Sequence, residues 1–354
     1  MSKFWNSKTR LIKPYVPGEQ PKDRKYIKLN TNESPYSPSP KVIEAIKSAA
    51  NEDLRLYPDP VCENLRRCIA AYFGLSQEEV FVGNGSDEIL AFSFAAFFEP
   101  SETILFPDVT YSFYPVYAEL FGLTFKEVVL DDAFSVPVEK FLVKNGGIVI
   151  ANPNAPTGKF LPIEEIKKII VHNNKLGKVV IVDEAYIDFG GESAAGLVKE
   201  YPNLLVVQTL SKSRALAGLR VGFALGASDL IAGLYRIQSS INSYTLDRLA
   251  LAGAIAAFSD ESHFQQIRRK VIQTRERVVR ELEADGFFII PSQANFIFIS
   301  YPRIQAQEMF RILREKGVLV RYFNKPRIEN FLRVSIGSDE EMDAFLSAVK
   351  RMIC

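Results

Sequence analysis

The chain has 354 residues, of which 47% are hydrophobic and 24% are charged, and its formal net charge is +1. This length exceeds one compact core and fits two domains. The balanced charge gives no reason to expect nucleic acid or an anionic membrane as a partner, and no apolar run reaches the roughly 18–20 residues that cross a bilayer.

Residues 1–45 are predicted to form an extended arm together with part of a small domain. The first ten residues, MSKFWNSKTR, are polar and lack the apolar middle of a signal peptide, so we expect a cytoplasmic protein. Prolines at positions 14, 17, 21, 35, 38 and 40 oppose regular helical structure over most of this arm.

Residues 46–260 are predicted to form a large α/β domain. Nearly continuous apolar runs alternate there with amphipathic stretches such as YSFYPVYAELF and IEEIKKIIVHNN. This alternation indicates a mostly parallel sheet covered by helices on both faces, with ligands bound where the strands end. The expected strands are TILF (103–106), GIVI (147–150), VVIVDEAY (179–186), LLVVQTL (204–210) and VGFALG (221–226).

Residues 261–354 are predicted to form a smaller α+β domain. It begins with a long charged helix, ESHFQQIRRKVIQTRERVVRELEADG, that ends at Gly286. Two further helices, IQAQEMFRILREKG and DEEMDAFLSAVKRMI, alternate with short apolar runs. The expected strands are FFII (287–290), NFIFIS (295–300), VLVRYF (318–323) and FLRVSI (331–336).

Few side chains could serve a metal or a histidine-based mechanism. The two histidines, His172 and His263, lie in polar helical stretches, and Cys62, Cys68 and Cys354 form no CxxC pair. We therefore expect no metal site and no Ser–His–Asp mechanism.

The stretch VGNGSDEIL (82–90) places Gly83 and Gly85 at the start of an apolar helix. Glycines allow a backbone to approach closely, and the free N–H groups of a helix N-terminus attract phosphate. A loop capped by a serine or an aspartate is the alternative interpretation. Neither this stretch nor PTGKF (156–160) has the spacing of a dinucleotide-binding or Walker loop.

The stretch VVIVDEAY ends an apolar strand with Asp183, Glu184 and Tyr186. A carboxylate at a buried strand end needs a cationic or N–H partner, because an isolated buried charge is costly. A structural ion pair or a helix cap would also satisfy this stretch. NPNAPTGKF (152–160), taken alone, indicates only a tight turn.

The stretch TLSKSRALAGLR (209–220) places Lys212 directly after an apolar strand. Thr209, Ser211 and Arg220 could hold a phosphate and leave Lys212 free as an amine, although an exposed surface lysine is the alternative. One ligand meets the demands of these stretches together. Pyridoxal phosphate has a phosphate, an aldehyde, a basic ring nitrogen and a ring hydroxyl.

The segment TLSKSRALAG resembles, position by position, the lysine signature of the class-II pyridoxal-phosphate aminotransferases. VGNGSDEIL, the PTG turn, DEAY and FLRVSIG follow in the order of that family, so the resemblance covers essentially the whole chain. It implies an aspartate-aminotransferase-like fold, fold type I of the pyridoxal-phosphate enzymes. The stretches most similar to the histidinol-phosphate aminotransferases are IKPYVPG (12–18), LNTNESPY (29–36), LRLYPDP (54–60), SQANFIF (292–298) and NFLRVSIG (330–337).

The resemblance implies that Lys212 forms the internal Schiff base with pyridoxal 5'-phosphate and then moves a proton between Cα and C4′. It implies that Asp183 pairs with the pyridine N–H and that Tyr186 donates to the ring oxygen. Tyr111 would stack on the ring, and Tyr57 would reach the cofactor phosphate of the neighbouring subunit in a homodimer with shared active sites. The phosphate would be held by Gly85, Ser86, Asp87, Thr209, Ser211 and Arg220.

The resemblance also implies a substrate. Arg333 matches the arginine that holds the anionic end of the substrate, while Arg321 and Tyr15 match further phosphate contacts in the histidinol-phosphate enzymes. The implied reaction is reversible amino transfer between histidinol phosphate and 2-oxoglutarate, in histidine biosynthesis. The partners are then small molecules, with no nucleic acid and no membrane.

One position departs from the family pattern. Ala155 stands immediately before the PTG turn, where many relatives have an asparagine that bonds the ring oxygen of the cofactor. Asn154 or Asn152 could take over this bond only through a shifted backbone, because neighbouring residues on an extended chain point in opposite directions.

Other functions remain open on the same scaffold. The nearest is an aminotransferase for phenylalanine or tyrosine, and a decarboxylase acting on threonine phosphate is a further choice. A regulatory domain that binds the cofactor without catalysis belongs to a different class, and the absence of an attached DNA-binding segment and the presence of Lys212 argue against it.

Overall fold

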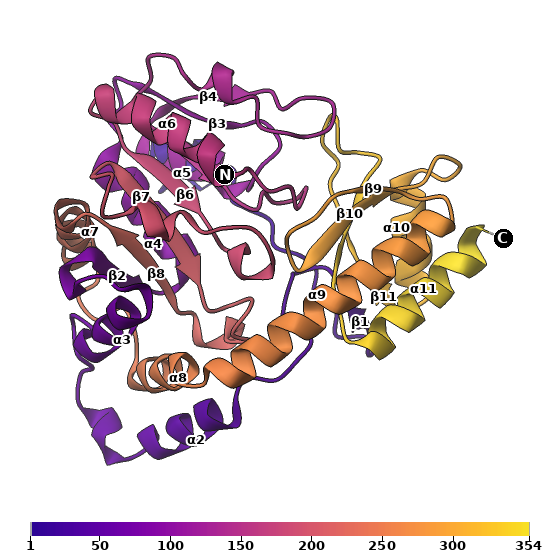
Figure 1. The fold of residues 1–354 in the computed structure, drawn as a ribbon, viewed down its shortest axis with the longest axis horizontal. Helices are drawn as coiled ribbons and strands as arrows, with labels where there is room; N and C mark the ends of the chain where they lie inside the picture. Colours follow the sequence, from indigo (N-terminus) through magenta and orange to yellow (C-terminus); the bar gives the residue numbers. More distant parts are fainter. Residues whose placement is uncertain (1, 354) are drawn as a thin grey trace.

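The computed structural model describes residues 2–353 and contains two units joined by the long helix α9 (Glu261–Ala284) (Figure 1). The larger unit is built on a seven-stranded sheet with the order β2-β8-β7-β6-β5-β3-β4. Strands β3 to β7 run parallel to one another, whereas β8 is antiparallel to β2 and β7. The predicted mostly parallel sheet is therefore confirmed. Its strands are β2 (Val80–Gly83), β3 (Thr103–Pro107), β4 (Thr124–Val128), β5 (Ile148–Ala151), β6 (Val180–Asp183), β7 (Leu204–Thr209) and β8 (Gly222–Gly226).

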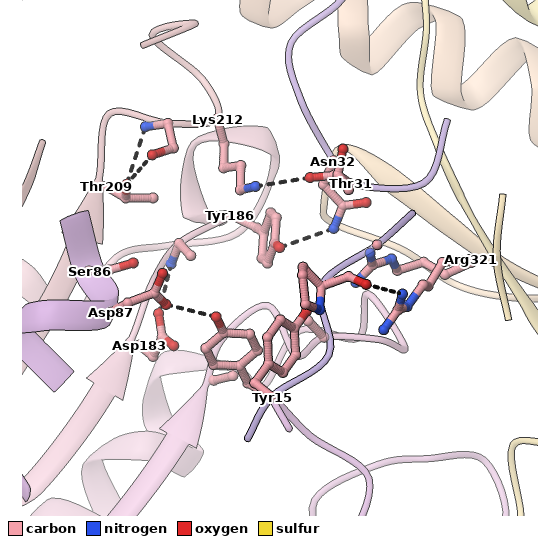
Figure 2. Close-up of a pocket in the computed structure, with 18 of the residues that line it drawn as sticks. Tyr15, Thr31, Asn32, Ser86, Asp87, Asp183, Tyr186, Thr209, Lys212 and Arg321 are labelled. Carbon is pink, nitrogen blue, oxygen red and sulfur yellow. Dashed lines mark hydrogen bonds between the residues drawn. The ribbon is translucent and has the colours of Figure 1, made fainter. Parts of the chain in front are cut away.

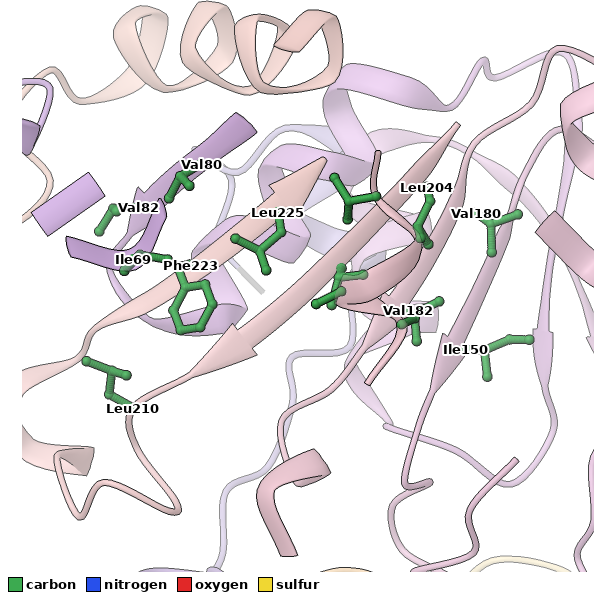
Figure 3. Close-up of a cluster of buried hydrophobic side chains, with 14 of the residues drawn as sticks. Ile69, Val80, Val82, Ile150, Val180, Val182, Leu204, Leu210, Phe223 and Leu225 are labelled. Atoms are coloured by element: carbon green, nitrogen blue, oxygen red, sulfur yellow. The ribbon is translucent and has the colours of Figure 1, made fainter. Parts of the chain in front are cut away.

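Helices cover both faces of this sheet, as the continuous apolar strands require. In β6, Val180 and Val182 pack into a core with α3, α6 and α8, part of which Figure 3 shows. Ile181 points to the opposite face and packs into a second core with α4, α5 and α7. The helices of this unit are α2 (Pro40–Ala49), α3 (Glu63–Phe73), α4 (Gly85–Phe97), α5 (Phe113–Phe121), α6 (Ile163–Lys175), α7 (Ser228–Ile241) and α8 (Arg248–Phe258).

The smaller unit is an antiparallel four-stranded sheet with the order β12-β13-β10-β9, covered by helices. Its buried core includes Leu29 of the N-terminal arm, and β1 of the arm pairs with β11. We therefore propose that the arm completes the smaller domain. The elements of the smaller unit are β1 (Ile27–Lys28), β9 (Phe288–Ile290), β10 (Phe296–Ser300), α10 (Ala306–Glu315), β11 (Val318–Leu319), β12 (Arg321–Tyr322), β13 (Leu332–Ser335) and α11 (Asp339–Ile353), whereas α1 (Ser7–Leu11) at the start of the arm lies beside Glu119 of α5.

The expected strand VLVRYF is divided between two sheets, so the prediction of one continuous strand was wrong. Val318 and Leu319 form β11 and pair with the arm strand β1, whereas Arg321 and Tyr322 form β12 and pair with β13. The hydrogen-bond partners on either side of Val320 thus come from different parts of the chain, and no local pattern distinguishes them. The division places Arg321 at the start of the strand beside β13.

Two further observations concern membranes and metals. No helix within residues 2–353 is long and apolar enough to cross a membrane. The same part of the chain contains no group of three His, Cys, Asp or Glu side chains placed to hold a metal ion. Cys62 and Cys68 carry free thiols, and Cys354 lies outside the described residues.

Candidate active site

A cavity of about 190 Å³ opens where the parallel strands end (Figure 2). Ala151, Asp183 and Thr209, the last residues of β5, β6 and β7, line it. Loops of the larger unit, the N-terminal arm and the smaller unit supply the rest of its lining. The predicted site residues that line this cavity are Tyr15, Ser86, Asp87, Tyr111, Asp183, Tyr186, Thr209, Ser211, Lys212, Arg220, Arg321 and Arg333.

Lys212 lies in the turn after β7 and extends into the cavity. Its Nζ donates to the backbone carbonyl of Thr31 at 3.2 Å and lies 5.9 Å from the centre of the Tyr186 ring. Burial, with a smaller contribution from the guanidinium of Arg333, lowers the pKa of Lys212 to about 8. A sizeable fraction of this amine is therefore neutral near pH 8, and a neutral amine is the form that can attack an aldehyde or accept a proton.

Asp183 ends β6 as a buried carboxylate. Its Oδ2 accepts a hydrogen bond from the hydroxyl of Tyr114 at 2.8 Å, and its Oδ1 accepts one from the backbone N–H of Ala185 at 3.2 Å. Burial raises the pKa of Asp183 to about 6, although the bond from Tyr114 opposes this shift. No lysine or arginine within residues 2–353 forms an ion pair with Asp183. A cationic ring N–H in the cavity would satisfy this charge.

The start of α4 and the turn before β8 form an anion cradle. Gly85 opens α4 with φ +79°, and a Cβ there would lie 2.5 Å from Nη2 of Arg220, so glycine lets the guanidinium lie against the helix N-terminus. Arg220 also lies 3.4 Å from Oδ2 of Asp87 and 3.5 Å from Oγ of Ser211. The hydroxyl of Thr209 donates to Ser211 at 3.0 Å. Helix N–H groups, hydroxyls and one guanidinium together suit a phosphate.

The carboxylate of Asp87 has a role that the resemblance did not indicate. It accepts a 2.7 Å hydrogen bond from the hydroxyl of Tyr111 and an ion-pair contact from Arg220. Asp87 therefore orients both the aromatic wall of the cavity and the guanidinium of the cradle. An acidic side chain in the first turn of a helix also interacts favourably with the helix dipole.

Two arginines lie at the opposite end of the cavity. Arg321 of β12 and Arg333 of β13 are directly opposed cross-strand partners. Arg333 donates through Nη2 to the carbonyl of Asn30 at 3.0 Å, and its buried Nε has no partner within residues 2–353. Both guanidinium groups lie over the ring of Phe323, at 5.5 Å and 5.6 Å from its centre. Like charges at opposed positions are unfavourable unless an anion lies between them.

The N-terminal arm brings an aromatic side chain to the same end. Tyr15 stacks on Phe113 with 4.3 Å between ring centres and lies 6.3 Å from the ring of Tyr111. Arg321 fixes this part of the arm, because its guanidinium donates to the carbonyls of Val16 at 2.9 Å and Pro17 at 3.2 Å. The arm, the larger unit and β12 thus meet over the cavity.

Three predicted residues do not line the cavity. Gly85 lies just behind it, at the start of α4. Asn154 is buried beneath it, and its amide is already used by Thr110, Thr157 and the carbonyl of Val109. Tyr57 is 77% exposed, away from the cavity, and stacks on Tyr244 with 4.6 Å between ring centres.

Asn152, the other candidate to replace the amide absent at position 155, is also fully buried. It exchanges two hydrogen bonds with the backbone of Leu161 and does not line the cavity. The methyl group of Ala155 does line the cavity.

The sequence-based prediction missed some polar residues that line or support the cavity. Asn30, Thr31 and Asn32 line it from the arm, and Tyr114 bonds Asp183 from below. The stretch LNTNESPY contributed only to the resemblance. Its three successive polar residues after Leu29 gave no indication that they would line a cavity. Tyr114 is part of an apolar helical pattern and gives no separate signal.

Comparison with known proteins identifies relatives over the full length. A model of the family described as "Aminotransferase class I and II" matches residues 24–349. A histidinol-phosphate aminotransferase of Clostridium acetobutylicum is 60% identical over 353 residues, which is 100% of both chains. One from Clostridium botulinum (strain Langeland) is 59% identical and covers 100% of this chain and 99% of its own.

Solved structures share the fold. A histidinol-phosphate aminotransferase from Sinorhizobium meliloti in complex with pyridoxal-5'-phosphate has a TM-score of 0.88 at 23% identity, covering 100% of this chain and 98% of that one. Aspartate aminotransferase from Thermus thermophilus with maleate has a TM-score of 0.86 at 19% identity, and the match covers 100% of both chains. At these identities the similarity establishes the aspartate-aminotransferase-like fold.

Proposed function

Because the chain belongs to the class I and II aminotransferase family, we propose that it transfers an amino group from histidinol phosphate to 2-oxoglutarate with pyridoxal phosphate as cofactor. The reaction exchanges the amine of one partner for the carbonyl oxygen of the other and is reversible. Relatives of that name, about 60% identical over the whole chain, support this function. It would place the enzyme in histidine biosynthesis and in the cytoplasm.

The residues at the cavity fit pyridoxal phosphate. The cradle at the start of α4 suits the phosphate, the buried carboxylate of Asp183 suits a protonated ring nitrogen, and Lys212 suits the aldehyde. When bound, the cofactor supplies the aldehyde and the electron-withdrawing ring that make the Cα proton of an amine acidic.

The remaining chemistry belongs to side chains of this protein. Lys212, whose pKa burial lowers to about 8, can hold a proton at Nζ and return it to a neighbouring carbon. Asp183 holds the proton on the ring nitrogen, because burial makes the carboxylate costly without a cationic partner. Tyr186 lines the cavity with its ring centre 5.9 Å from Nζ of Lys212, and its hydroxyl can donate a hydrogen bond to the ring oxygen of the cofactor.

The observation that carries the choice of substrate is the cross-strand pair of Arg321 and Arg333. Both arginines line the cavity that holds Lys212 and Asp183. A phosphate carries up to two charges and offers three acceptor oxygens, so it can engage both guanidinium groups, whereas a carboxylate is satisfied mainly by one. The stacked rings of Tyr15 and Phe113 suit the flat imidazole next to that phosphate.

We also propose that two copies of the chain assemble and share their active sites. Tyr57 is 77% exposed, and its stacking on Tyr244 holds it in a fixed position outside its own cavity. Leu54, Leu56 and Val61 beside it are exposed at 56%, 45% and 44%. An exposed apolar patch that carries ordered aromatic side chains is typical of a protein interface.

A half-reaction screen tests the proposed substrate. The protein loaded with pyridoxal phosphate is mixed in turn with histidinol phosphate, glutamate, phenylalanine, tyrosine and threonine phosphate, and the absorbance of the bound cofactor is followed. We expect histidinol phosphate and glutamate to discharge this absorbance fastest, with no release of carbon dioxide. A faster reaction with phenylalanine or tyrosine would identify an aromatic aminotransferase, and no reaction with any amine would identify a cofactor-binding protein without this activity.

A further inference from the structure

Asn32 of the N-terminal arm is buried inside the cavity, although the resemblance assigns it no role. It is 1% exposed and lines the cavity beside Lys212. Its backbone has φ +55°, in the left-handed region that asparagine and glycine tolerate better than other residues. Its Nδ2 donates to the hydroxyl of Tyr186 at 3.0 Å, as Figure 2 shows.

The other end of the Asn32 amide is fixed by the smaller unit. The hydroxyl of Ser335 donates to Oδ1 of Asn32 at 2.9 Å and accepts the backbone N–H of Asn32 at 2.8 Å. Asn295 donates through Nδ2 to the backbone carbonyl of Asn32 at 3.0 Å. Because the single hydroxyl proton of Ser335 is directed to Oδ1, the amide must present its N–H group to Tyr186.

This orientation decides what the phenol of Tyr186 can do. A tyrosine hydroxyl has one proton, and a hydroxyl that accepts a bond from Asn32 is free to donate that proton elsewhere. No other group within residues 2–353 exchanges a hydrogen bond with the Tyr186 hydroxyl. The proton of Tyr186 is therefore available to an acceptor in the cavity. Ala155, which also lines the cavity, cannot donate to that acceptor because its side chain is a methyl group.

We propose that Asn32 is a positioning residue that makes Tyr186 a hydrogen-bond donor to the ring oxygen of the cofactor. Tyr186 would then serve an oxygen that, in many relatives, also receives a bond from an asparagine at the position of Ala155. This inference rests on the proposed cofactor but not on the identity of the amino donor. The chain Ser335–Asn32–Tyr186 then links β13, two residues beyond Arg333, to the cofactor ring.

Two substitutions separate the amide from the backbone that carries it. Asn32→Gly keeps the left-handed backbone and removes the amide alone. Asn32→Asp also tolerates this backbone and still accepts from Ser335, but its carboxylate accepts the proton of Tyr186 instead of donating to it. Asn32→Asp should therefore act more strongly than Asn32→Gly, and as strongly as Tyr186→Phe.

The decisive readout is the pH titration of the absorbance of the bound cofactor. A donor to the ring oxygen stabilises the deprotonated form of the bound cofactor, so losing the donor should raise the pKa of this titration. We expect a rise in Asn32→Gly, a larger rise in Asn32→Asp and Tyr186→Phe, and a roughly three- to tenfold loss of kcat in Asn32→Gly. In a Tyr186→Phe background, neither substitution at position 32 should raise this pKa further.

Asn295→Ala is the matched control, because Asn295 is equally buried and bonds Asn32 but does not contact Tyr186. It should lower the thermal stability and leave the titration unchanged. Equal shifts from Asn32→Gly with and without the Tyr186 hydroxyl, or no shift in either Asn32 variant, would overturn the proposal. If the bound cofactor of the wild-type protein titrates and the variants shift its pKa as expected, but histidinol phosphate does not react, only the proposed substrate is refuted. If the wild-type protein binds no pyridoxal phosphate, both proposals are refuted.

Discussion

The hydroxyl of Tyr114 donates a 2.8 Å hydrogen bond to Oδ2 of Asp183, and both side chains are buried beneath the cavity. Tyr114 comes from α5, and Asp183 comes from the end of β6. The bond stabilises the carboxylate, but burial outweighs it and raises the pKa of Asp183 to about 6. The protein without cofactor thus carries a carboxylate whose ionisation opposes folding.

Asp183→Asn should stabilise the protein without cofactor at pH 8 and inactivate the loaded enzyme. A pKa raised from 3.8 to about 6 means that the folded state binds the proton more tightly, so the destabilisation is full above pH 6 and is relieved as the pH falls towards 4. This shift corresponds to about 3 kcal/mol at most. Thermal unfolding of wild type and variant at pH 8, 6 and 4.5 measures it, and the advantage of the variant should shrink at the lowest pH.

Glu184→Gln is the control for this experiment. Burial raises the pKa of Glu184 to about 7, but its carboxylate bonds Ser193, Ala194 and Gln208 and does not line the cavity. It should change the pH dependence of stability and leave turnover near that of wild type. If Asp183→Asn also kept normal turnover, another group would have to support the ring nitrogen.

The reaction of the cofactor-free protein with pyridoxal phosphate should speed up with pH and level off above about pH 8. Only the neutral amine of Lys212 attacks an aldehyde, and burial together with Arg333 lowers its pKa to about 8. Below that pH the rate should rise about tenfold per unit, as followed by the change in cofactor absorbance. A rate that still rises tenfold per unit between pH 9 and 10 would indicate a lysine with an ordinary pKa.

Lys212→Ala should fold, bind pyridoxal phosphate only non-covalently and lose nearly all amino transfer, because the amine both anchors the aldehyde and moves the proton. Borohydride reduction of the loaded wild-type protein, followed by peptide mapping, should label Lys212. Lys159, a neighbour of the PTG turn bonded to Ser135, provides a matched control as Lys159→Ala, which should keep the label on Lys212. A label on another lysine of the wild-type protein would end the assignment.

Arg321→Ala should lower kcat/KM for histidinol phosphate more than it lowers kcat/KM for phenylalanine or tyrosine. The phosphate can use both opposed guanidinium groups, and losing one charge-assisted contact is worth roughly 1.5–3 kcal/mol, or on the order of 10–100-fold in kcat/KM. The measurement is kcat/KM for both kinds of substrate in wild type and variant. Equal losses would remove the reason for assigning the phosphate to this pair.

Arg327→Ala controls for the general effect of removing an arginine from the smaller unit. Arg327 bonds Asp108 at 2.6 Å and the carbonyls of Leu130 and Asp131, and it does not line the cavity. Any loss should therefore be the same for all substrates.

Tyr57→Ala should weaken cofactor retention if its side chain reaches the active site of a second copy. Mixing inactive Lys212→Ala protein with the Tyr57 variant should restore activity, because hybrid dimers would contain one site with both groups intact. Tyr244→Ala, which removes the stacking partner of Tyr57, should weaken retention to a smaller degree. If activity does not recover although the subunits are shown to exchange, Tyr57 does not contribute to the active site of a second copy.

The sequence by itself determined the framework of the larger unit. Continuous apolar runs such as VVIVD and LLVVQT must be buried on both faces, and this requirement predicts a covered parallel sheet, which the structure confirms. Parallel strands also align their carboxyl ends, so the positions of Asp183 and Lys212 at two strand ends predict that these side chains lie near one another. These inferences depend only on local hydrophobicity and on the direction of the chain.

Only the tertiary structure decided the contacts that join distant segments. The pairing of Arg321 with Arg333 depends on the register between β12 and β13, and the bonds of Asn32 to Tyr186 and Ser335 span more than 150 residues of chain. An asparagine in a polar arm and a serine at the end of a short strand carry no local signal of such a partner. The reason is physical: a hydrogen bond needs its two groups at about 3 Å with suitable angles, and that geometry arises only when the arm and both units pack around one cavity.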